Sequence, residues 1–287
     1  MKNNFSENII IIPIYNDWKS LNKLLTEINK TLSKSDLYKI LIINDCSTQE
    51  INIENKKFTK LKEIKILSLK KNLGSQKSLS IGLDYLTKFK KKFYITIMDG
   101  DGEDNPLEIK KLLNNARMNK DYIITSHRKN RNENFIIKLS YKIHLIISFF
   151  FTWHWISFGN FSCFNSINLK KLDLNDVWYA FSGGVLKNCK IKKMYASRQR
   201  RYFESSKVNF LKLVEHSFRI ISLFYKRVLI SSLALTCVVW MTHSSFSYLL
   251  YALIFLTNIT LFFIKFNNRK KSKENLNSFI KEIKILM

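Results

Sequence analysis

Glycine and proline are scarce in this sequence, with seven and two residues among 287. Flexible linkers and repeat arrays are rich in one or both, so the composition argues against them. The four cysteines, Cys46, Cys163, Cys189 and Cys237, lie far apart and form no CxxC pair. This spacing argues against a zinc knuckle and a disulfide framework, and it fits a reducing, cytosolic setting for the soluble part of the chain.

Acidic residues are also few. The chain has 22 Asp and Glu against 48 Lys and Arg, a net charge of +26. Such an excess favours a polyanionic partner: nucleic acid, a phosphate-bearing ligand or an anionic membrane surface. We expect no nucleic-acid partner, because no recognised binding motif appears and much of the charge adjoins apolar segments. The first apolar run is short and meets Pro13, which predicts a strand and not a signal peptide.

Residues 1–128 alternate between apolar runs and segments with helical spacing. We expect strands over 8–16, 38–47, 63–69, 92–101 and 121–128, and helices over 20–32, 74–89 and 105–118. This alternation predicts an α/β fold with a mostly parallel, Rossmann-like sheet and helices on both faces. In such sheets ligands bind beyond the carboxyl ends of the strands.

Residues 129–227 form a second region, which we assign to the acceptor and the membrane surface. The aromatic segment 143–158 is predicted to be an interfacial or re-entrant helix, with a buried core helix as an equal alternative. Between positions 190 and 227 the sequence has eleven Lys and Arg residues but two Glu residues.

Residues 228–266 contain two apolar runs with basic flanks, Lys226 and Arg227 before them and "RKKSK" after them. The positive-inside rule predicts a transmembrane hairpin with both ends cytoplasmic, the alternative being a buried helical pair. Residues 267–287 are then a basic cytoplasmic tail, for which an amphipathic surface helix is one reading. These features predict a multi-pass protein of the cytoplasmic (inner) membrane with a cytoplasmic catalytic domain.

An acidic turn, "MDGDGEDNPLEI", follows the fourth expected strand. Asp99 and Asp101 flank Gly100, and such a pair can direct two carboxylates at one Mg²⁺ or Mn²⁺ ion. The spacing excludes an EF-hand loop. By itself a DxD turn is more often a solvated loop, and the acids after it, including Glu103, suit the start of a helix.

Several motifs occur in a characteristic order: "PIYND" from Pro13, "INDCS", "NLGSQKSLSIGL", the DGD turn, "SHR" and "RYFESSK". Together they resemble the GT-A family of inverting glycosyltransferases. The similarity is greatest to the membrane-associated branch with dolichyl-phosphate mannose synthase and bacterial polyprenyl-phosphate glycosyltransferases. It covers roughly residues 7–265.

The resemblance implies a role for each matched position. One group would meet the nucleoside and its base: Pro13, Tyr15, Asp17, Ile43 and Asp45. A second group would carry the metal and the diphosphate: Asp99, Gly100 and Asp101, with Glu103 where the family often has Gln. A third group would close the fifth strand and grip phosphates: Arg128, Arg201 and Lys207. Three positions depart from the family pattern, namely Asn44, Cys46 and Glu204.

The implied reaction moves a sugar from a UDP- or GDP-sugar to a polyprenyl (undecaprenyl or dolichyl) phosphate, with inversion and with a divalent metal as cofactor. Few carboxylates follow the fifth strand, which agrees with a phosphate acceptor because it needs no general base. The alternatives are a lipid-linked glycan or surface polysaccharide acceptor, and a membrane scaffold with a degenerate site. The sequence leaves a homo-oligomer open.

Overall fold

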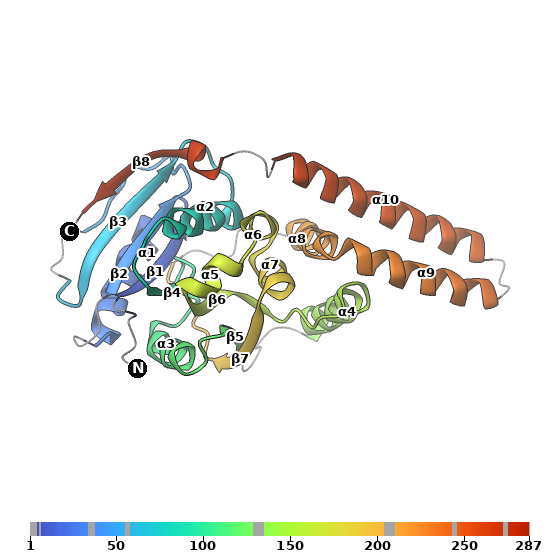
Figure 1. The fold of residues 1–287 in the computed structure, drawn as a ribbon, viewed down its shortest axis with the longest axis horizontal. Coiled ribbons are helices and arrows are strands. Elements are labelled where there is room, and N and C mark those ends of the chain that lie inside the picture. The colour runs from blue at the N-terminus through green and yellow to red at the C-terminus, as the bar shows by residue number, and fades with distance from the viewer. Residues whose placement is uncertain are drawn as a thin grey trace. The chain divides into compact units, whose positions relative to one another are not determined.

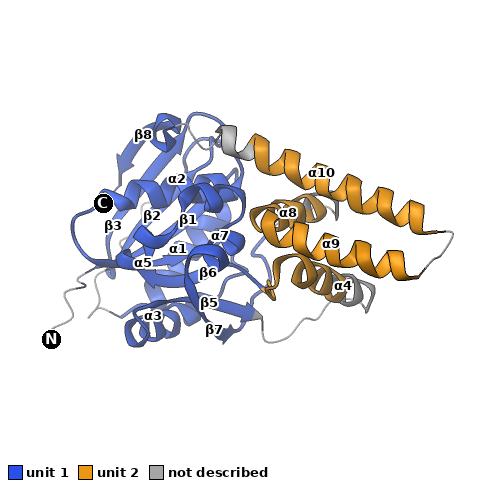
Figure 2. Cartoon of the chain, turned by 45° about the vertical axis from the view of Figure 1, so that its right-hand side comes forward, with its two compact units in different colours: residues 1–130, 158–205, 274–287 blue, residues 131–157, 206–273 orange. Residues whose placement is uncertain are grey.

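The computed structural model describes residues 5, 7–33, 38–54, 58–128, 135–203, 210–242, 246–271 and 275–286. The chain forms two compact units, each built from separate stretches of sequence (Figure 2). The first comprises Met1–Asn130, Phe158–Ser205 and Glu274–Met287, and the second comprises Arg131–Ser157 and Ser206–Lys273. The sequence predicted four consecutive regions instead, because a composition shift marks where a segment changes character and not where the chain returns to an earlier unit.

The first unit is organised around an eight-stranded sheet with the order β7-β5-β6-β4-β1-β2-β3-β8 (Figure 1). The strands are β1 (Glu7–Ile14), β2 (Tyr38–Asn44), β3 (Leu61–Leu69), β4 (Phe93–Ile97), β5 (Tyr122–Arg128), β6 (Phe158–Asn165), β7 (Lys190–Ala196) and β8 (Ile280–Ile285). The pairs β1–β2, β1–β4, β2–β3 and β5–β7 are parallel, whereas β6 and β8 pair antiparallel with their neighbours. The predicted mixed, mostly parallel α/β sheet is confirmed.

Helices cover both faces of this sheet because successive side chains of β1 point to opposite sides. Ile10, Ile12 and Ile14 share a buried cluster with residues of α1 (Trp18–Thr31) and α3 (Ile109–Met118), which follows the short helix η1 (Pro106–Glu108). Ile11 lies on the other side, near Gly82 of α2 (Ser75–Thr87). The remaining helices of the unit are α5 (Ser166–Lys171), α6 (Leu174–Tyr179) and α7 (Phe181–Asn188).

The aromatic segment 143–158 is not one helix. Helix α4 (Phe135–Thr152) ends at Thr152, and Phe158 already opens strand β6. Strand β6 runs antiparallel to β4, with Ile97 opposite Ser162. The sequence prediction missed β6 because most of its residues are buried and show no alternation of polar and apolar positions. Its amino end consequently lies at the carboxyl end of β4.

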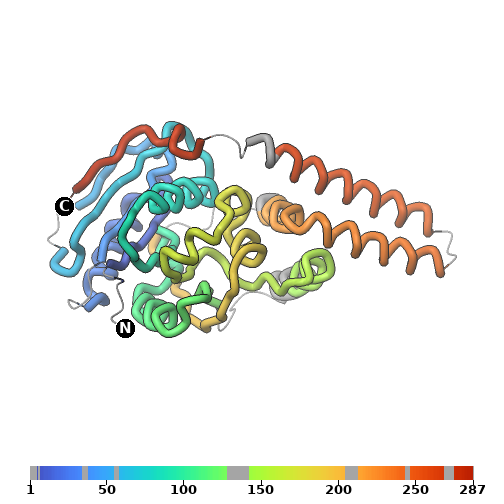
Figure 3. The backbone as a smooth tube through the Cα atoms, in the orientation of Figure 1, coloured from blue at the N-terminus to red at the C-terminus, as the bar shows by residue number. Residues whose placement is uncertain are grey.

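The C-terminal segment contains a strand of the sheet, so the reading of this segment as an amphipathic surface helix was wrong. After η2 (Leu276–Phe279), strand β8 pairs antiparallel with β3, although the two are far apart in sequence (Figure 3). Phe279 is buried and packs against Trp178, with ring centroids 5.5 Å apart. The open edge of β3 offers unpaired backbone groups, which the alternating segment "IKEIKI" satisfies.

The second unit is helical and contains α4, α8 (Phe210–Leu223), α9 (Tyr225–Met241) and α10 (Ser247–Lys271). Among the described residues, the stretch Ser247–Asn267 is long and apolar enough to cross a membrane, with a mean hydropathy of 2.0 over its best window. Helix α9 has 17 residues and passes the same test only jointly with α8, from which it is bent by 95°. Because a span needs about 20 residues, the described part of the chain has one candidate span, or two if the bent pair counts as one, and the predicted hairpin is not confirmed.

Candidate active site

The predicted nucleoside and metal residues come from three adjacent parallel strands. Tyr15 follows β1, Asp45 follows β2, and Asp99 follows β4 after one further residue. Because the order is β4-β1-β2 and all three strands are parallel, their carboxyl ends lie at one edge of the sheet. Tyr15 is 46% exposed there, so its ring is accessible to a ligand.

The loop after β1 is tied to the loop after β2 by Asn16, which has a φ of 51°. Its side-chain oxygen accepts hydrogen bonds from the N–H groups of Thr48 (2.8 Å) and Gln49 (3.2 Å), and its amide donates to the Thr48 hydroxyl. Asp17 caps α1 by accepting from Ser20 N–H at 3.2 Å. Sequence reasoning singled out Asp17 and passed over Asn16, although Asn is among the residues that tolerate a positive φ.

Asp45 is buried and holds the loop before α2. Its two carboxylate oxygens accept from the N–H groups of Leu73 (2.8 Å) and Gly74 (2.7 Å). Burial raises the pKa of Asp45, and these hydrogen bonds act against the rise. Pro13 and Ile43 are register partners inside the sheet, and Ile43 is fully buried. These two positions therefore shape the edge from within the core.

The acidic turn places Asp99 and Asp101 close enough to influence each other. Asp99 accepts from the Asn160 amide at 3.1 Å, and its own N–H donates to Asp104 at 2.9 Å. Burial, reinforced by the charge of Asp101, raises the pKa of Asp99 to about 6. Burial also raises the pKa of Asp101, and the Arg201 guanidinium opposes that rise. Between them, Gly100 fits closely, because a Cβ there would lie 2.9 Å from Ile14 Cδ1.

Residues 197–203, which we call the arginine strap, run along the acidic turn. The N–H groups of Gln199 and Tyr202 donate to the carbonyls of Glu103 (2.9 Å) and Asp101 (3.1 Å). Arg201 pairs with Asp101 at 2.9 Å. The strap thus brings two cationic side chains, Arg198 and Arg201, onto the acidic turn.

Glu103 was predicted to join the metal site, and in the structure it faces two of the three strap arginines, Arg198 and Arg201. It forms an ion pair with Arg198, and one of its oxygens lies 3.5 Å from Arg201 Nε. The described residues include no group of three or more His, Cys, Asp or Glu placed to hold a metal. Two mutually repelling carboxylates still fit a divalent cation, since Mg²⁺ usually takes one or two and completes its shell with water and phosphate oxygens.

Tyr202 anchors the strap on its other side. Its hydroxyl donates to Glu27 of α1 at 2.5 Å, and Lys23 lies 4.5 Å from the ring centroid. The ring also covers Gly102, where a Cβ would approach its atoms to 2.3 Å. Gly102 has a φ of +87°, a backbone conformation that favours glycine, and the Tyr202 ring leaves no room for a larger side chain at this position.

Two further predicted site residues, Arg128 and Lys207, are described in part or not at all. Arg128 is the last residue of β5, opposite Ala196 of β7, and its side chain lies outside the described residues. Lys207 and the departing Glu204 also lie outside the described residues.

The site contains residues that sequence reasoning did not select, chiefly Gln76, Asn160, Arg198 and Tyr202. Gln76 donates to Asn160 at 3.0 Å, and Asn160 donates to Asp99. The motif "NLGSQKSLSIGL" contained Gln76, but its spacing gave no chemical reason to choose it. Asn160 depends on β6, a strand that the sequence prediction did not include.

A mixed, mostly parallel sheet with paired carboxylates at its carboxyl edge is the GT-A arrangement. The model of glycosyl transferase family 2 matches residues 9–183, which is more than half of the chain. The protein therefore belongs to glycosyl transferase family 2, which confirms the resemblance of its motifs to GT-A glycosyltransferases.

Two curated relatives match part of the chain. An uncharacterized glycosyltransferase of Synechocystis, sll0501, is 27% identical over 140 residues, covering 47% of this chain and 43% of its own length. An uncharacterized protein of Methanocaldococcus jannaschii, MJ0544, is 28% identical over 107 residues, covering 37% of this chain and 44% of its own. The matches thus span less than half the length of these relatives.

Solved structures share the fold. Glucosyl-3-phosphoglycerate synthase from Mycobacterium tuberculosis, solved with Mn²⁺ and UDP-glucose, has a TM-score of 0.54 at 12% identity over 77% of this chain and 79% of its own. TarS from S. aureus has a TM-score of 0.51 at 17% identity, over 78% of this chain and 40% of its own. At these identities the likeness concerns the fold alone.

Proposed function

We propose that the protein is a metal-dependent, inverting glycosyltransferase that moves a sugar from a nucleotide-diphosphate sugar to a polyprenyl phosphate. The observation that carries the proposal is the pair Asp99 and Asp101 at the carboxyl end of β4, beside the ends of β1 and β2, in a chain of family 2. Ligands of open α/β sheets bind at this edge. Tyr15, Asp17 and Asp45 would line the nucleoside side of the site.

The leaving group of this reaction is a nucleoside diphosphate, on which negative charge grows in the transition state. A divalent cation, Mg²⁺ or Mn²⁺, held by Asp99 and Asp101, would supply Lewis-acid stabilisation of that charge. Arg201 would donate charge-assisted hydrogen bonds to the phosphate oxygens, and Lys207 is the second proposed cation. The nucleoside would be uridine or guanosine. UDP with Mn²⁺ is the first pair to test, since the synthase structure was solved with Mn²⁺ and UDP-glucose.

Few carboxylates after β5 in the described part of the chain could act as a general base, which favours a phosphate nucleophile over a sugar hydroxyl. Asp173 is the N-cap of α6 and accepts from Asn175 N–H. Asp176 accepts from Lys187 and Asn188, each at 2.9 Å, so its carboxylate is already engaged. The side chain that donates a hydrogen bond to the Asp99 carboxylate is the Asn160 amide, which is not basic. A lipid phosphate is already an anion and needs no such base.

The path of the chain supports two membrane crossings. Residues 158–205 and 274–287 belong to the same folded unit. If this unit lies on one side of a membrane, the stretch 206–273 must leave that side and return to it. A stretch that starts and ends on one side crosses an even number of times. If α10 is one crossing, the bent pair α8 and α9 supplies the other. The basic residues near both ends favour the cytoplasm for the first unit.

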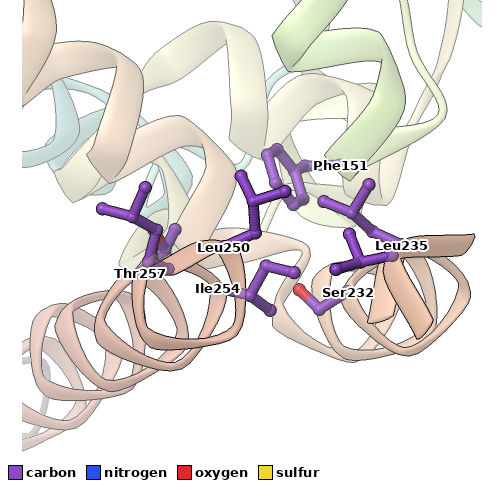
Figure 4. A pocket seen from close by; sticks show the side chains of 8 residues that line it. Phe151, Ser232, Leu235, Leu250, Ile254 and Thr257 are labelled. Carbon is purple, nitrogen blue, oxygen red and sulfur yellow. Dashed lines mark hydrogen bonds between the residues drawn. The ribbon is translucent and has the colours of Figure 1, made fainter. Parts of the chain in front are cut away.

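The second unit also offers room for a hydrocarbon chain. A cavity of about 260 Å³ lies among α4, α9 and α10 (Figure 4). Its lining is mainly apolar, with Phe151, Leu235, Leu250 and Ile254, and Ser232 and Thr257 as hydroxyl groups. Such a lining suits part of an isoprenoid tail.

The donor side is tested by calorimetry on the full chain in detergent. We expect UDP or GDP to bind with Mn²⁺ or Mg²⁺, and Asp99→Asn or Asp101→Asn to abolish the metal-dependent part of the binding. Asp121→Asn, on an exposed turn, is the matched control. Metal-independent binding with unchanged affinity in both variants would exclude the proposed metal site.

The acceptor is tested by incubation with radiolabelled UDP- and GDP-sugars. A single-sugar lipid formed with undecaprenyl or dolichyl phosphate supports the proposal. Product formed only with a lipid-linked glycan or polysaccharide would assign the alternative acceptor. No transfer in any arm, together with no nucleotide binding, would favour a non-catalytic scaffold.

A further inference from the structure

We propose that Gln76 and Asn160 are positioning residues, which fix the Asp99 carboxylate in the orientation that the divalent cation requires. The proposal rests on the proposed metal-dependent function. The three side chains form a continuous chain of hydrogen bonds, from Gln76 Nε2 to Asn160 Oδ1 at 3.0 Å and from Asn160 Nδ2 to Asp99 Oδ1 at 3.1 Å.

The chain of hydrogen bonds begins at a backbone group. The N–H of Phe181, the first residue of α7, donates to Gln76 Oε1 at 2.6 Å. The first N–H groups of a helix have no partner within it, and the N-cap residue Ala180 provides no side-chain bond here. Gln76 therefore satisfies a buried backbone donor, because Phe181 is fully buried.

This anchor sets the direction of every hydrogen bond that follows. A backbone N–H can only donate, so Gln76 must present its oxygen to Phe181 and its NH₂ group to Asn160. Asn160 must then present its oxygen to Gln76 and its NH₂ group to Asp99. If either amide rotated by 180°, it would lose its hydrogen bonds and would bring two donors or two acceptors together. Asp99 consequently meets a donor, the Asn160 amide, whose orientation is set by the backbone N–H of Phe181 through Gln76.

We call the hydrogen bonds that link Phe181, Gln76, Asn160 and Asp99 the relay. Three elements of the first unit hold it in place. Gln76 lies in the first turn of α2, Asn160 lies near the start of β6, and Phe181 opens α7. The backbone carbonyl of Asn160 also accepts from Ser162 Oγ at 2.9 Å. Sites mounted on helices and strands keep their geometry better than sites on loops.

The relay uses one oxygen of Asp99 and leaves the other to a cation. Fixing one carboxylate oxygen by a hydrogen bond orients the second, as outer partners do at other metal sites. Asp101 is held differently, by an ion pair with Arg201. The two carboxylates of the turn are thus positioned by independent devices, and the relay concerns Asp99 alone.

The test changes the relay at the residue farthest from the metal. In Gln76→Glu the side chain still accepts from Phe181 N–H but can no longer donate to Asn160, so the Asn160 amide turns its NH₂ group away from Asp99. We expect the Kd for Mn²⁺ alone, measured by electron paramagnetic resonance on the full chain in detergent, to rise about 10-fold or more. Gln76→Ala, which adds no charge, should raise it in the same direction.

A matched control makes the same kind of amide-to-acid change elsewhere. Asn114→Asp, on an exposed position of α3, should keep the wild-type Kd. Saturating Mn²⁺ should restore most of kcat in Gln76→Glu, whereas general loss of the fold would not be rescued by metal.

A double-variant cycle decides whether Gln76 acts through Asn160. Asn160→Ala should raise the Kd for Mn²⁺, and Gln76→Glu in that background should add nothing, because the bond that it reverses is gone. Wild-type affinity in Gln76→Glu and Gln76→Ala, or fully additive losses in the double variant, would overturn the relay alone. A wild-type protein that binds no Mn²⁺ would overturn the proposed metal site and the relay with it.

Discussion

Arg201 is paired with Asp101, one of the two carboxylates proposed to hold a cation. The guanidinium Nη2 lies 2.9 Å from Asp101 Oδ2, and both side chains are less than one-third exposed. A cation that binds Asp101 must share or displace this partner. At the proposed site the strap would therefore couple metal binding to the position of Arg201, which would become available to the diphosphate of the proposed donor when it leaves the carboxylate.

This coupling predicts opposite effects of one substitution on two ligands. In Arg201→Ala, Mn²⁺ alone should bind several-fold more tightly, because it no longer competes with the guanidinium for Asp101. UDP or GDP with saturating Mn²⁺ should bind about 10- to 150-fold more weakly, since a charge-assisted contact worth about 1.5–3 kcal/mol is lost. Titration calorimetry measures both affinities. Arg200→Ala, an exposed neighbour in the same strap, should change neither. Equal weakening of both ligands by Arg201→Ala would contradict the exchange.

Gly102 should not tolerate even a methyl group. With a φ of +87° and the Tyr202 ring 2.3 Å from an added Cβ, Gly102→Ala should destabilise the protein by about 2–4 kcal/mol. Thermal unfolding in detergent measures the loss. Gly159→Ala, where an added Cβ meets nothing within 4 Å, should stay within about 0.5 kcal/mol. Adding Tyr202→Ala to Gly102→Ala should cost less than the sum of the single losses, because the overlap disappears.

The part of the site that sequence could predict is the part made by strand ends. Tyr15 and Asp99 directly follow apolar runs, Asp45 follows one after Asn44, and parallel strands bring such positions to one edge. The sequence near each of these residues was sufficient to predict its position, because that position depends only on the strand that precedes it.

The rest of the site depends on contacts between distant segments. Asn160 meets Asp99 because β6 inserts antiparallel beside β4, and the strap meets the acidic turn about 100 positions earlier. Strand β8 was read as a tail because its six residues follow a long apolar helix, and only the open edge of β3 gives them a partner. Hydrophobic periodicity carries no information on these pairings.

Asp45 should be needed for stability apart from any contact with a nucleotide. In Asp45→Asn, one oxygen can still accept from Leu73 or Gly74, but the new NH₂ group faces the other N–H as donor against donor. We expect a loss of about 1–3 kcal/mol in the free energy of unfolding. Thermal unfolding without ligand measures it, and Asp121→Asn at an exposed turn serves as the control. An unchanged melting temperature would show that the two hydrogen bonds do not hold the loop.

His127, near the end of β5, should make the first unit sensitive to mild acid. Burial, reinforced by the charge of Lys193, lowers the pKa of His127 to about 4, and its ring lies 3.1 Å from the Thr125 hydroxyl. The unfolded chain, with an ordinary pKa of 6.5, binds a proton before the folded one does. The stabilisation is therefore complete above pH 6.5 and is lost as pH falls from 6.5 through 4, which amounts to about 2 kcal/mol between pH 7 and pH 5.

A neutral substitute should remove this acid sensitivity. From pH 7 to pH 5 the melting temperature of the wild type should fall by about 4–8 °C more than that of His127→Gln, measured in the same detergent. At pH 7 the variant itself should be less stable, because the buried ring also packs against Phe158, with centroids 5.5 Å apart. The difference between the two pH values isolates the proton from this packing loss. Parallel pH profiles of the two proteins would show that His127 titrates alike in the folded and unfolded chains, against the burial seen at β5.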